Sequence, residues 1–227
     1  MRLLAIDTAL GDCSAAVLHR TADGIDVLHE RSRTIGRGHA EQLMSVIGEV
    51  LDAAGLTYAD LTKIAVTVGP GSYTGLRVGL ATARALSLTL KIPAVGIGTL
   101  QALAAGGQAD HPGQTIIAAI DARHGAIYHQ AFSANDAISQ PAIDPIVDVV
   151  ADLPKQMVLA VGSGAQLLSE AAERAGHQME TLDLHAPAIA DVARLGAGAP
   201  VQSVAPEPLY LKPPDAQPAV RGKIARQ

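Results

Sequence analysis

The chain has 227 residues, of which 48% are hydrophobic and 17% charged, so it is long and apolar enough to build a packed core and disorder is not expected. Its formal net charge is −5 and its 17 lysines and arginines are scattered, so we expect no basic stripe that binds nucleic acid. Its four tyrosines and one phenylalanine lie far apart in sequence, so we expect no base-stacking platform. No apolar run approaches the roughly 20 residues that cross a bilayer, and Asp7 interrupts the amino-terminal apolar run, so we expect a cytoplasmic protein with no membrane association.

Strand and helix patterns fill the first half of the chain. Short apolar runs between turn residues predict strands, and apolar residues at helical spacing predict helices. In chain order we expect strands at 3–6, 13–19 and about 25–29, a helix at about 38–54, a strand at 63–68, a helix at 76–90 and a strand at 94–97. Gly55 follows the first helix as a natural carboxyl cap. This order predicts a mixed sheet, beginning with an antiparallel meander and flanked by helices.

The second half repeats the plan of the first. Residues 104–114 are small and polar, which suggests a domain joint. The following "IIAAIDARHGAIYHQAF" then resembles "LLAIDTALGDCSAAVLH": each has an apolar strand ending in Ile-Asp, a turn with glycine and a second strand. A strand, a Gly-Ser-Gly turn and a helix follow at 157–176, and a last short helix at 189–198. We therefore expect a duplicated α/β protein of two domains, the second one more degenerate.

The glycine-rich stretch "GPGSYTG" before the second helix does not fit the usual phosphate-binding motifs. A P-loop requires a lysine beside its last glycine, and the dinucleotide fingerprint requires a different glycine spacing. A tight turn that exploits the backbone freedom of glycine explains the composition. An anion contact at the start of the following helix remains the alternative.

The helix after this turn is apolar on more than one face. Gly75, Gly79 and Ala83 recur every four residues, and Leu76 and Leu80 lie between them. Small residues on one helix face allow another backbone to approach closely. Such a helix needs two packing partners: its own sheet, and either another domain or another protein.

Catalytic and metal-binding patterns are weak in this sequence. No two histidines have the spacing that places both imidazoles on one helix face. Asp7 and Asp121, each at the end of a strand, could hold Mg²⁺ through water or could simply form turns, and both interpretations stay open. Arg123 and His124 beside Asp121 have no second carboxylate nearby, so they make a weak acid–base site.

Several motifs, taken in order, resemble one bacterial family. These are "IDT", "RGHAEQL", "VGPGSYTGLRVGLATARAL", "IPAVGIGTL", "IDARHGAIY" and the late "PLYLK". Together they resemble the TsaB family, also called YeaZ, over nearly the whole chain up to about Lys212. The late motif ends in lysine where many relatives have arginine, and the Pro-rich stretch after it has no clear counterpart in the family.

The resemblance implies the actin-like fold of sugar kinases and heat-shock ATPases, with two duplicated domains. We place an amino-terminal domain at 1–107, which carries the dimerisation helices, a smaller domain at 108–212, and a Pro-rich tail at 213–227.

The resemblance also implies a role in making threonylcarbamoyladenosine at position 37 of tRNAs that read codons starting with A. The family member is regarded as a non-catalytic scaffold that pairs with the transferase TsaD, in a system in which TsaE hydrolyses ATP, and that forms a homodimer when TsaD is absent. The tRNA would be contacted only indirectly. TsaD carries a His-x-x-x-His metal motif after its counterpart of "IPAVGI", whereas "GIGTLQAL" stands there in this chain. We therefore expect no catalytic residue, no metal ligand and no tightly bound cofactor.

The family pairs through the two helices that follow its amino-terminal loops. Carried onto this chain, the expected interface residues are Glu41, Met44, Gly75, Leu76, Gly79, Leu80 and Ala83. If nucleotide is bound, ATP or ADP with Mg²⁺ would lie at the junction with TsaD, and Asp7, Thr8 and Gly11 are the candidate nucleotide-facing residues.

Two other functions stay open at this point. The chain could be an autonomous ATPase or glycoprotease-like enzyme, although the missing histidines argue against the protease. It could also be a fragment of a small-molecule kinase, but two small domains leave little room for the insertions that such kinases use around their substrates.

Overall fold

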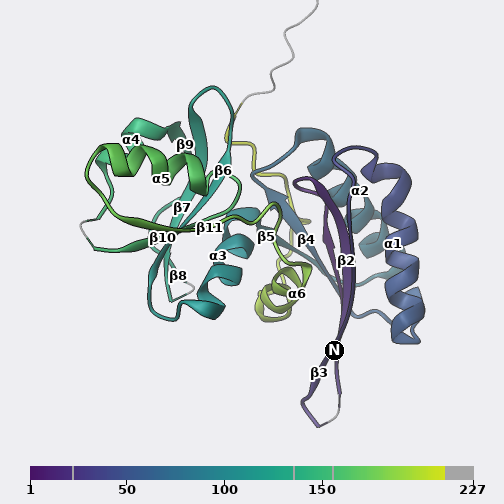
Figure 1. The fold of residues 1–227 in the computed structure, drawn as a ribbon. Coiled ribbons are helices and arrows are strands. Elements are labelled where there is room, and N and C mark those ends of the chain that lie inside the picture. The colour runs from purple at the N-terminus through teal and green to yellow at the C-terminus, as the bar shows by residue number, and fades with distance from the viewer. Residues whose placement is uncertain (22, 135, 155, 213–227) are drawn as a thin grey trace, which may run out of the picture.

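The computed structural model describes residues 1–21, 23–134, 136–154 and 156–212, which form two β-sheets side by side, each flanked by helices (Figure 1). The first sheet has the strand order β3-β2-β1-β4-β5. Its elements are β1 (Arg2–Asp7), β2 (Asp12–Arg20), β3 (Asp26–Thr34), α1 (His39–Ala54), the short 3₁₀ helix η1 (Tyr58–Asp60), β4 (Lys63–Gly69), α2 (Tyr73–Leu90) and β5 (Ala94–Gly98). The strands β1 to β3 form the predicted antiparallel meander, and β1, β4 and β5 run parallel.

The second sheet repeats this pattern with the order β11-β10-β6-β7-β8, and β9 also pairs with β7. Its elements, with α3 preceding them, are α3 (Thr99–Asp110), β6 (Thr115–Asp121), β7 (Ala126–Ser133), β8 (Asp136–Ala137), β9 (Ala142–Pro145), α4 (Ile146–Ala151), β10 (Val158–Val161), α5 (Ala165–Arg174), β11 (Met179–Leu182) and α6 (Ile189–Gly198). Again the first two strands are antiparallel, while β6, β10 and β11 are parallel. The expected duplicated α/β architecture with mixed sheets is confirmed.

The central strands of the first sheet are buried on both faces, which explains their nearly continuous apolar sequences. The helices α1 and α2 cover one face (Figure 1). The buried stripe of α1 consists of His39, Leu43, Val46, Ile47, Val50 and Leu51. Gly55 ends α1 in the left-handed conformation, with a φ of 65°, as expected of a carboxyl-terminal glycine.

The opposite face of the first sheet is covered by α6, although α6 follows the second sheet in sequence. Ile189, Val192 and Ala193 of α6 pack into the same cluster as Leu3 and Ala65 of the sheet. Gly196 allows this approach, since a side chain there would overlap the Cβ of Ala65. The domain ranges 1–107 and 108–212 stay a prediction. However, α6 belongs by sequence to the second range and packs on the sheet of the first.

Most of the stretch 104–114, which we expected to be a domain joint, belongs to a helix. The helix α3 runs to Asp110 and lies between the two sheets, with Ala102 against the first sheet and Leu103 against the second. Its Gly107 is required for this fit, because a Cβ there would lie only 2.7 Å from Cγ1 of Val161. Close packing of α3 against the second sheet therefore explains Gly107, which lies in the stretch expected to be a domain joint.

The segment 199–212 crosses back over the first sheet and is held there by hydrogen bonds. Lys63 Nζ donates to the carbonyl oxygen of Ala199 at 2.6 Å. Arg84 donates from Nε and Nη2 to the carbonyl oxygen of Pro206, at 3.0 and 2.7 Å. The Leu209 amide donates to the Val68 carbonyl at 2.7 Å. These bonds bring residues 209–212 beside the start of α2; the predicted tail at 213–227 lies outside the described residues.

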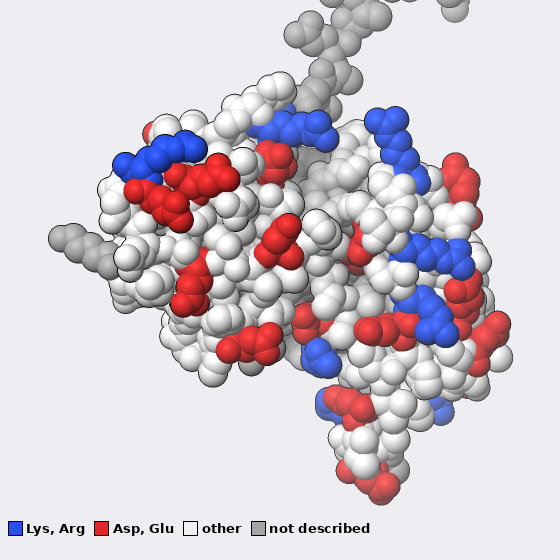
Figure 2. Space-filling model, viewed as in Figure 1, with Lys and Arg blue, Asp and Glu red and all other residues white. Residues whose placement is uncertain are grey.

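Charged side chains are interspersed on the face shown in Figure 2, with acidic and basic groups mixed. None of the helices in the described part of the chain combines the length and hydropathy that a bilayer crossing requires.

Candidate functional site

The glycine-rich loop between β4 and α2 is packed tightly between two other segments. A Cβ at Gly71 would overlap the carbonyl oxygen of Ala9, and one at Gly69 would lie 2.8 Å from that of Leu209. Gly69 also has a φ of 115°, which side-chain-bearing residues rarely adopt. Close approach of the amino-terminal turn and the carboxyl-terminal segment therefore explains the glycines of this loop.

The helix α2 begins at Tyr73, three residues before the predicted start. Ser72 caps it, because its Oγ accepts a hydrogen bond from the Gly75 amide at 3.3 Å. This cap was not recognised from the sequence, where Ser72 and Tyr73 were assigned to the turn.

The small-residue face of α2 packs against its own chain. Gly75 and Gly79 both meet Thr8: a Cβ at Gly75 would overlap the Thr8 carbonyl oxygen, and one at Gly79 would lie 2.5 Å from Thr8 Oγ1. Thr8 Oγ1 in turn donates to the Gly75 carbonyl at 2.8 Å. Leu76, Leu80 and Ala83 are buried on the same side. The expectation that these five residues present a face to a second helix is therefore corrected: their partner is this chain's amino-terminal turn and sheet.

The other two expected interface residues lie at the surface. Glu41 and Met44 are exposed on α1, and 49% of Met44 is accessible to solvent. On α2 the exposed side carries Ala81, Ala85 and Leu88, and Leu88 is 81% exposed. The surface that α1 and α2 offer to another molecule is this outer side, which we call the outer helix face.

Asp7 is fully buried, although sequence reasoning suggested that it faces a nucleotide. Its Oδ1 accepts hydrogen bonds from Thr67 Oγ1 at 2.6 Å and from the Ala9 amide at 3.0 Å. Its Oδ2 has no hydrogen-bond partner among the described residues. Burial raises the pKa of Asp7 to about 6. The hydrogen bond from Thr67 lowers this pKa, but its effect is smaller than that of burial.

Thr8 and Gly11 accompany Asp7 in the turn between β1 and β2. Thr8 is buried against α2, as described above. The carbonyl oxygen of Gly11 accepts hydrogen bonds from the amides of Ile35 and Gly36, at 3.1 and 2.9 Å. The structure thus brings the three predicted residues together, but the side chains of Asp7 and Thr8 turn into the protein.

Asp121, the counterpart of Asp7 in the second sheet, is exposed and shapes its own turn. Its Oδ1 accepts the Arg123 amide at 2.7 Å, and its amide donates to Ser163 Oγ at 3.3 Å. These bonds favour the turn-forming interpretation of Asp121 over the Mg²⁺ interpretation. Among the described residues, no group of three or more histidine, cysteine, aspartate or glutamate side chains is placed to hold a metal ion.

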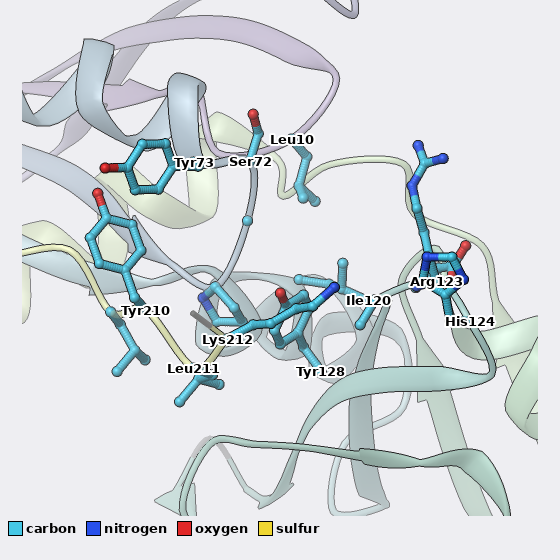
Figure 3. Close-up of a pocket in the computed structure, with 15 residues that line it drawn as sticks. Leu10, Ser72, Tyr73, Ile120, Arg123, His124, Tyr128, Tyr210, Leu211 and Lys212 are labelled. Atoms are coloured by element: carbon cyan, nitrogen blue, oxygen red, sulfur yellow. Dashed lines mark hydrogen bonds between the residues drawn. The ribbon is translucent and has the colours of Figure 1, made fainter. Parts of the chain in front are cut away.

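A pocket of about 320 Å³ opens where the loops of the two sheets meet the carboxyl-terminal segment (Figure 3). Leu10 and residues 70–73 line it from the first sheet, and residues 120–124 with Tyr128 line it from the second. Residues 209–212 complete it. Sequence reasoning missed this pocket, because its walls come from four distant segments. All three of its tyrosines nevertheless lie in motifs that carried the family resemblance, "GPGSYTG", "IDARHGAIY" and "PLYLK".

Known proteins are similar to this chain over most of its length. A family model described as TsaD, tRNA N6-adenosine threonylcarbamoyltransferase, matches residues 30–214. The tRNA threonylcarbamoyladenosine biosynthesis protein TsaB of Buchnera aphidicola subsp. Schizaphis graminum is 33% identical over 170 residues, covering 71% of this chain and 78% of the relative. The chain belongs to the TsaB (YeaZ) family.

Other members of the TsaB family match over a greater length. TsaB of Escherichia coli is 28% identical over 227 residues, covering 93% of this chain and 95% of the relative. A solved structure, YeaZ from Pseudomonas aeruginosa, has a TM-score of 0.77 at 25% identity and covers 92% of this chain and 99% of that one. In this TsaB-family chain the "GPGSYTGLR" motif forms the packed loop and first turns of α2, and it contributes Tyr73 to the pocket.

Proposed function

We propose that this chain takes part in the synthesis of threonylcarbamoyladenosine at position 37 of tRNA as a non-catalytic partner of TsaD. The outer helix face would be the pairing surface. TsaE would be the third component, and the same face would form a homodimer when TsaD is absent.

The relatives support the pathway part of this proposal. The Buchnera and Escherichia coli proteins are both named for threonylcarbamoyladenosine biosynthesis, and the matching family model is described as the tRNA threonylcarbamoyltransferase. Their coverage of this chain includes both sheets, so the relationship is not confined to one shared motif.

The packing of α3 supports the non-catalytic part. The resemblance places the transferase's metal-binding histidines just after the strand that corresponds to β5, where α3 begins in this chain. Here Leu100 and Leu103 occupy the first turns of α3, and both are buried in the apolar cluster against the second sheet. This region serves the core of the molecule and presents no imidazole to a ligand.

The observation that carries the pairing surface is the exposed apolar strip on α2. Ala81, Ala85 and Leu88 recur at spacings of three and four residues, so they share one side of the helix. Two small residues beside a projecting leucine allow the close approach of another helix. Thr8 already packs against the small residues Gly75 and Gly79 of α2. We therefore expect TsaD to contact the outer strip instead of that small-residue face.

The test is size-exclusion chromatography of the chain mixed with its cognate TsaD. Leu88→Asp places a charge in the proposed interface without touching the core, so we expect the complex to be lost or weakened at least tenfold. Leu167→Asp is a matched control, because Leu167 is also an exposed leucine in a helix, but on α5. Co-elution of Leu88→Asp as complete as that of the wild type would contradict the proposed surface.

The same mixture of the chain and TsaD tests the role of nucleotide in pairing. We propose that ATP or ADP with Mg²⁺, if required, acts at the junction with TsaD rather than as a tightly bound cofactor of this chain. Repeating the chromatography with and without ATP measures this directly.

A further inference from the structure

We propose that the outer surface of α4 and α5 is a docking site for residues 219–226 of this same chain. These residues lie outside the part that the structure describes. Their sequence, "AVRGKIAR", combines two larger apolar side chains with three cationic ones. The contact is intramolecular, it is separate from the outer helix face on α1 and α2, and it does not depend on pairing with TsaD.

The first observation is apolar surface on a pair of packed helices. The helices α4 and α5 lie side by side over the second sheet (Figure 1). Their inner sides share one apolar cluster, with Val149 and Val150 from α4 and Leu168 from α5. Their outer sides expose Val147 at 70% and Leu167 at 40%. Exposed apolar residues are common on proteins, so the charge around these two is needed to choose an occupant.

The second observation is that the same helix pair is acidic. Asp148 in α4, Asp152 directly after it, and Glu170 and Glu173 in α5 are all exposed. Arg174 is the one arginine or lysine in the two helices, and its Nη2 lies 3.7 Å from Oε2 of Glu170. The helix pair therefore carries a surplus of three negative charges beside its exposed valine and leucine.

The third observation is the uneven distribution of charge along the chain. Residues 1–107 contain nine aspartates and glutamates and nine lysines and arginines, whereas residues 108–212 contain 12 and five. In residues 213–227 the balance reverses, with Arg221, Lys223 and Arg226 against Asp215. A cationic segment attached to an acidic domain is attracted to it, and the attachment keeps its effective concentration in the millimolar range.

This distribution favours the chain's own surface over nucleic acid as the partner of the basic segment. An RNA strand that approached the three cations would be repelled by the acidic second half of the chain. The exposed valine and leucine of the helix pair also match the apolar side chains of Val220 and Ile224, whereas a phosphate backbone offers them no contact.

The basic segment can reach the helix pair. Lys212, the last described residue, lines the same pocket as Arg123 and His124 in the turn after β6. This turn adjoins α4, because the Ile146 amide donates a hydrogen bond to the Gly125 carbonyl at 2.9 Å. The residues between Lys212 and Val220 span about 23 Å when fully extended. Since α5 is about 15 Å long, the segment is long enough to lie along both helices.

The experiment is NMR spectroscopy of the full, isotope-labelled chain with a nitroxide attached to Gln227→Cys. The native Cys13 is buried, so the label reacts at the new cysteine. We expect the nitroxide to broaden the amide signals of α4 and α5 more than those of α1 and α2. Because ion pairs contribute to docking, this broadening should fall about twofold or more when NaCl is raised to about 0.5 M.

Paired isosteric substitutions test the surface itself. Asp148→Asn with Glu170→Gln neutralises two of the four carboxylates and should reduce the broadening about twofold or more. Glu30→Gln with Asp52→Asn is the matched control, because both residues are exposed in the first half of the chain and the change in charge is the same. We expect no effect of the control pair. The amide spectrum of each variant reports whether it folds.

Three results would overturn the proposal. The first is broadening that is equal over both sheets or unchanged by Asp148→Asn with Glu170→Gln. The second is equally strong broadening between a spin-labelled chain and a separate isotope-labelled chain, because the segment would then dock on a second copy. The third is loss of the broadening when equimolar hexa-adenylate RNA is added, which would assign the segment to nucleic acid. None of these results changes the outcome of the TsaD pairing test.

Discussion

At the residue scale, the structure changes the meaning of the aspartate at the end of β1. Its position at a strand end suggested Mg²⁺ or nucleotide, yet Asp7 is enclosed by Thr67, Ala9 and the start of β2. A carboxyl with one oxygen bonded and one without a described partner is costly to ionise. Asp7 therefore acts as a structural group whose protonation is coupled to folding.

This coupling predicts a pH dependence of stability. The pKa of Asp7 rises from 3.8 to about 6 on folding. An acid whose pKa is raised in the folded state stabilises the fold most when it is protonated, so this contribution is complete below about pH 4 and is lost as the pH rises through 6. A shift of this size corresponds to about 3 kcal/mol.

Asp7→Asn isolates the effect, because asparagine keeps an oxygen for Thr67 and Ala9 but does not titrate. In urea unfolding at a series of pH values, we expect the stability of Asp7→Asn relative to wild type to improve by about 3 kcal/mol between pH 4 and pH 7. Asp121→Asn, at the exposed counterpart, is the control. A relative stability of Asp7→Asn that stays constant over this range would show that Asp7 has no raised pKa.

At the scale of the element, α2 shows that a helix pattern identifies a face but not its partner. Gly75, Gly79 and Ala83 correctly indicated a close approach by other atoms. The sequence could not say whether those atoms belong to this chain, because the approaching Thr8 is about 70 residues away and its carbonyl oxygen carries no side-chain signal. The outer strip with Leu88, by contrast, was recognisable only once burial was known.

A pair of glycine substitutions tests this packing. Gly79→Ala should lower the free energy of unfolding by about 1–3 kcal/mol, because the new Cβ would lie 2.5 Å from Thr8 Oγ1, which is itself held by a hydrogen bond. Gly48→Ala on α1 is the matched control: no atom lies within 4 Å of its Cβ position, so better helix propensity should stabilise by about 0.5–1 kcal/mol. Urea unfolding that ranks the two variants in the opposite order would refute the packing.

At the scale of the whole molecule, much of the architecture was predictable because the two halves of the sequence repeat the same pattern of strands and turns. The repeated strand, turn and strand around Asp7 and Asp121 indicated the duplication, and the local periodicities located most helices and strands. The crossing of α6 onto the first sheet and the helix α3 between the sheets were not predicted, since both depend on contacts between distant segments. The pocket was missed for the same reason: Tyr73, Tyr128 and Tyr210 line one pocket only in the folded chain.

The central claim is that this chain supports threonylcarbamoyl transfer without performing it. The most direct measurement is the threonylcarbamoyladenosine content of an unmodified tRNA after incubation with threonylcarbamoyl adenylate, ATP, TsaD and TsaE, with and without this chain. The account predicts modification only when the chain is present together with TsaD, and none with the chain alone. Modification by the chain in the absence of TsaD, or equal modification whether or not the chain is added, would contradict it.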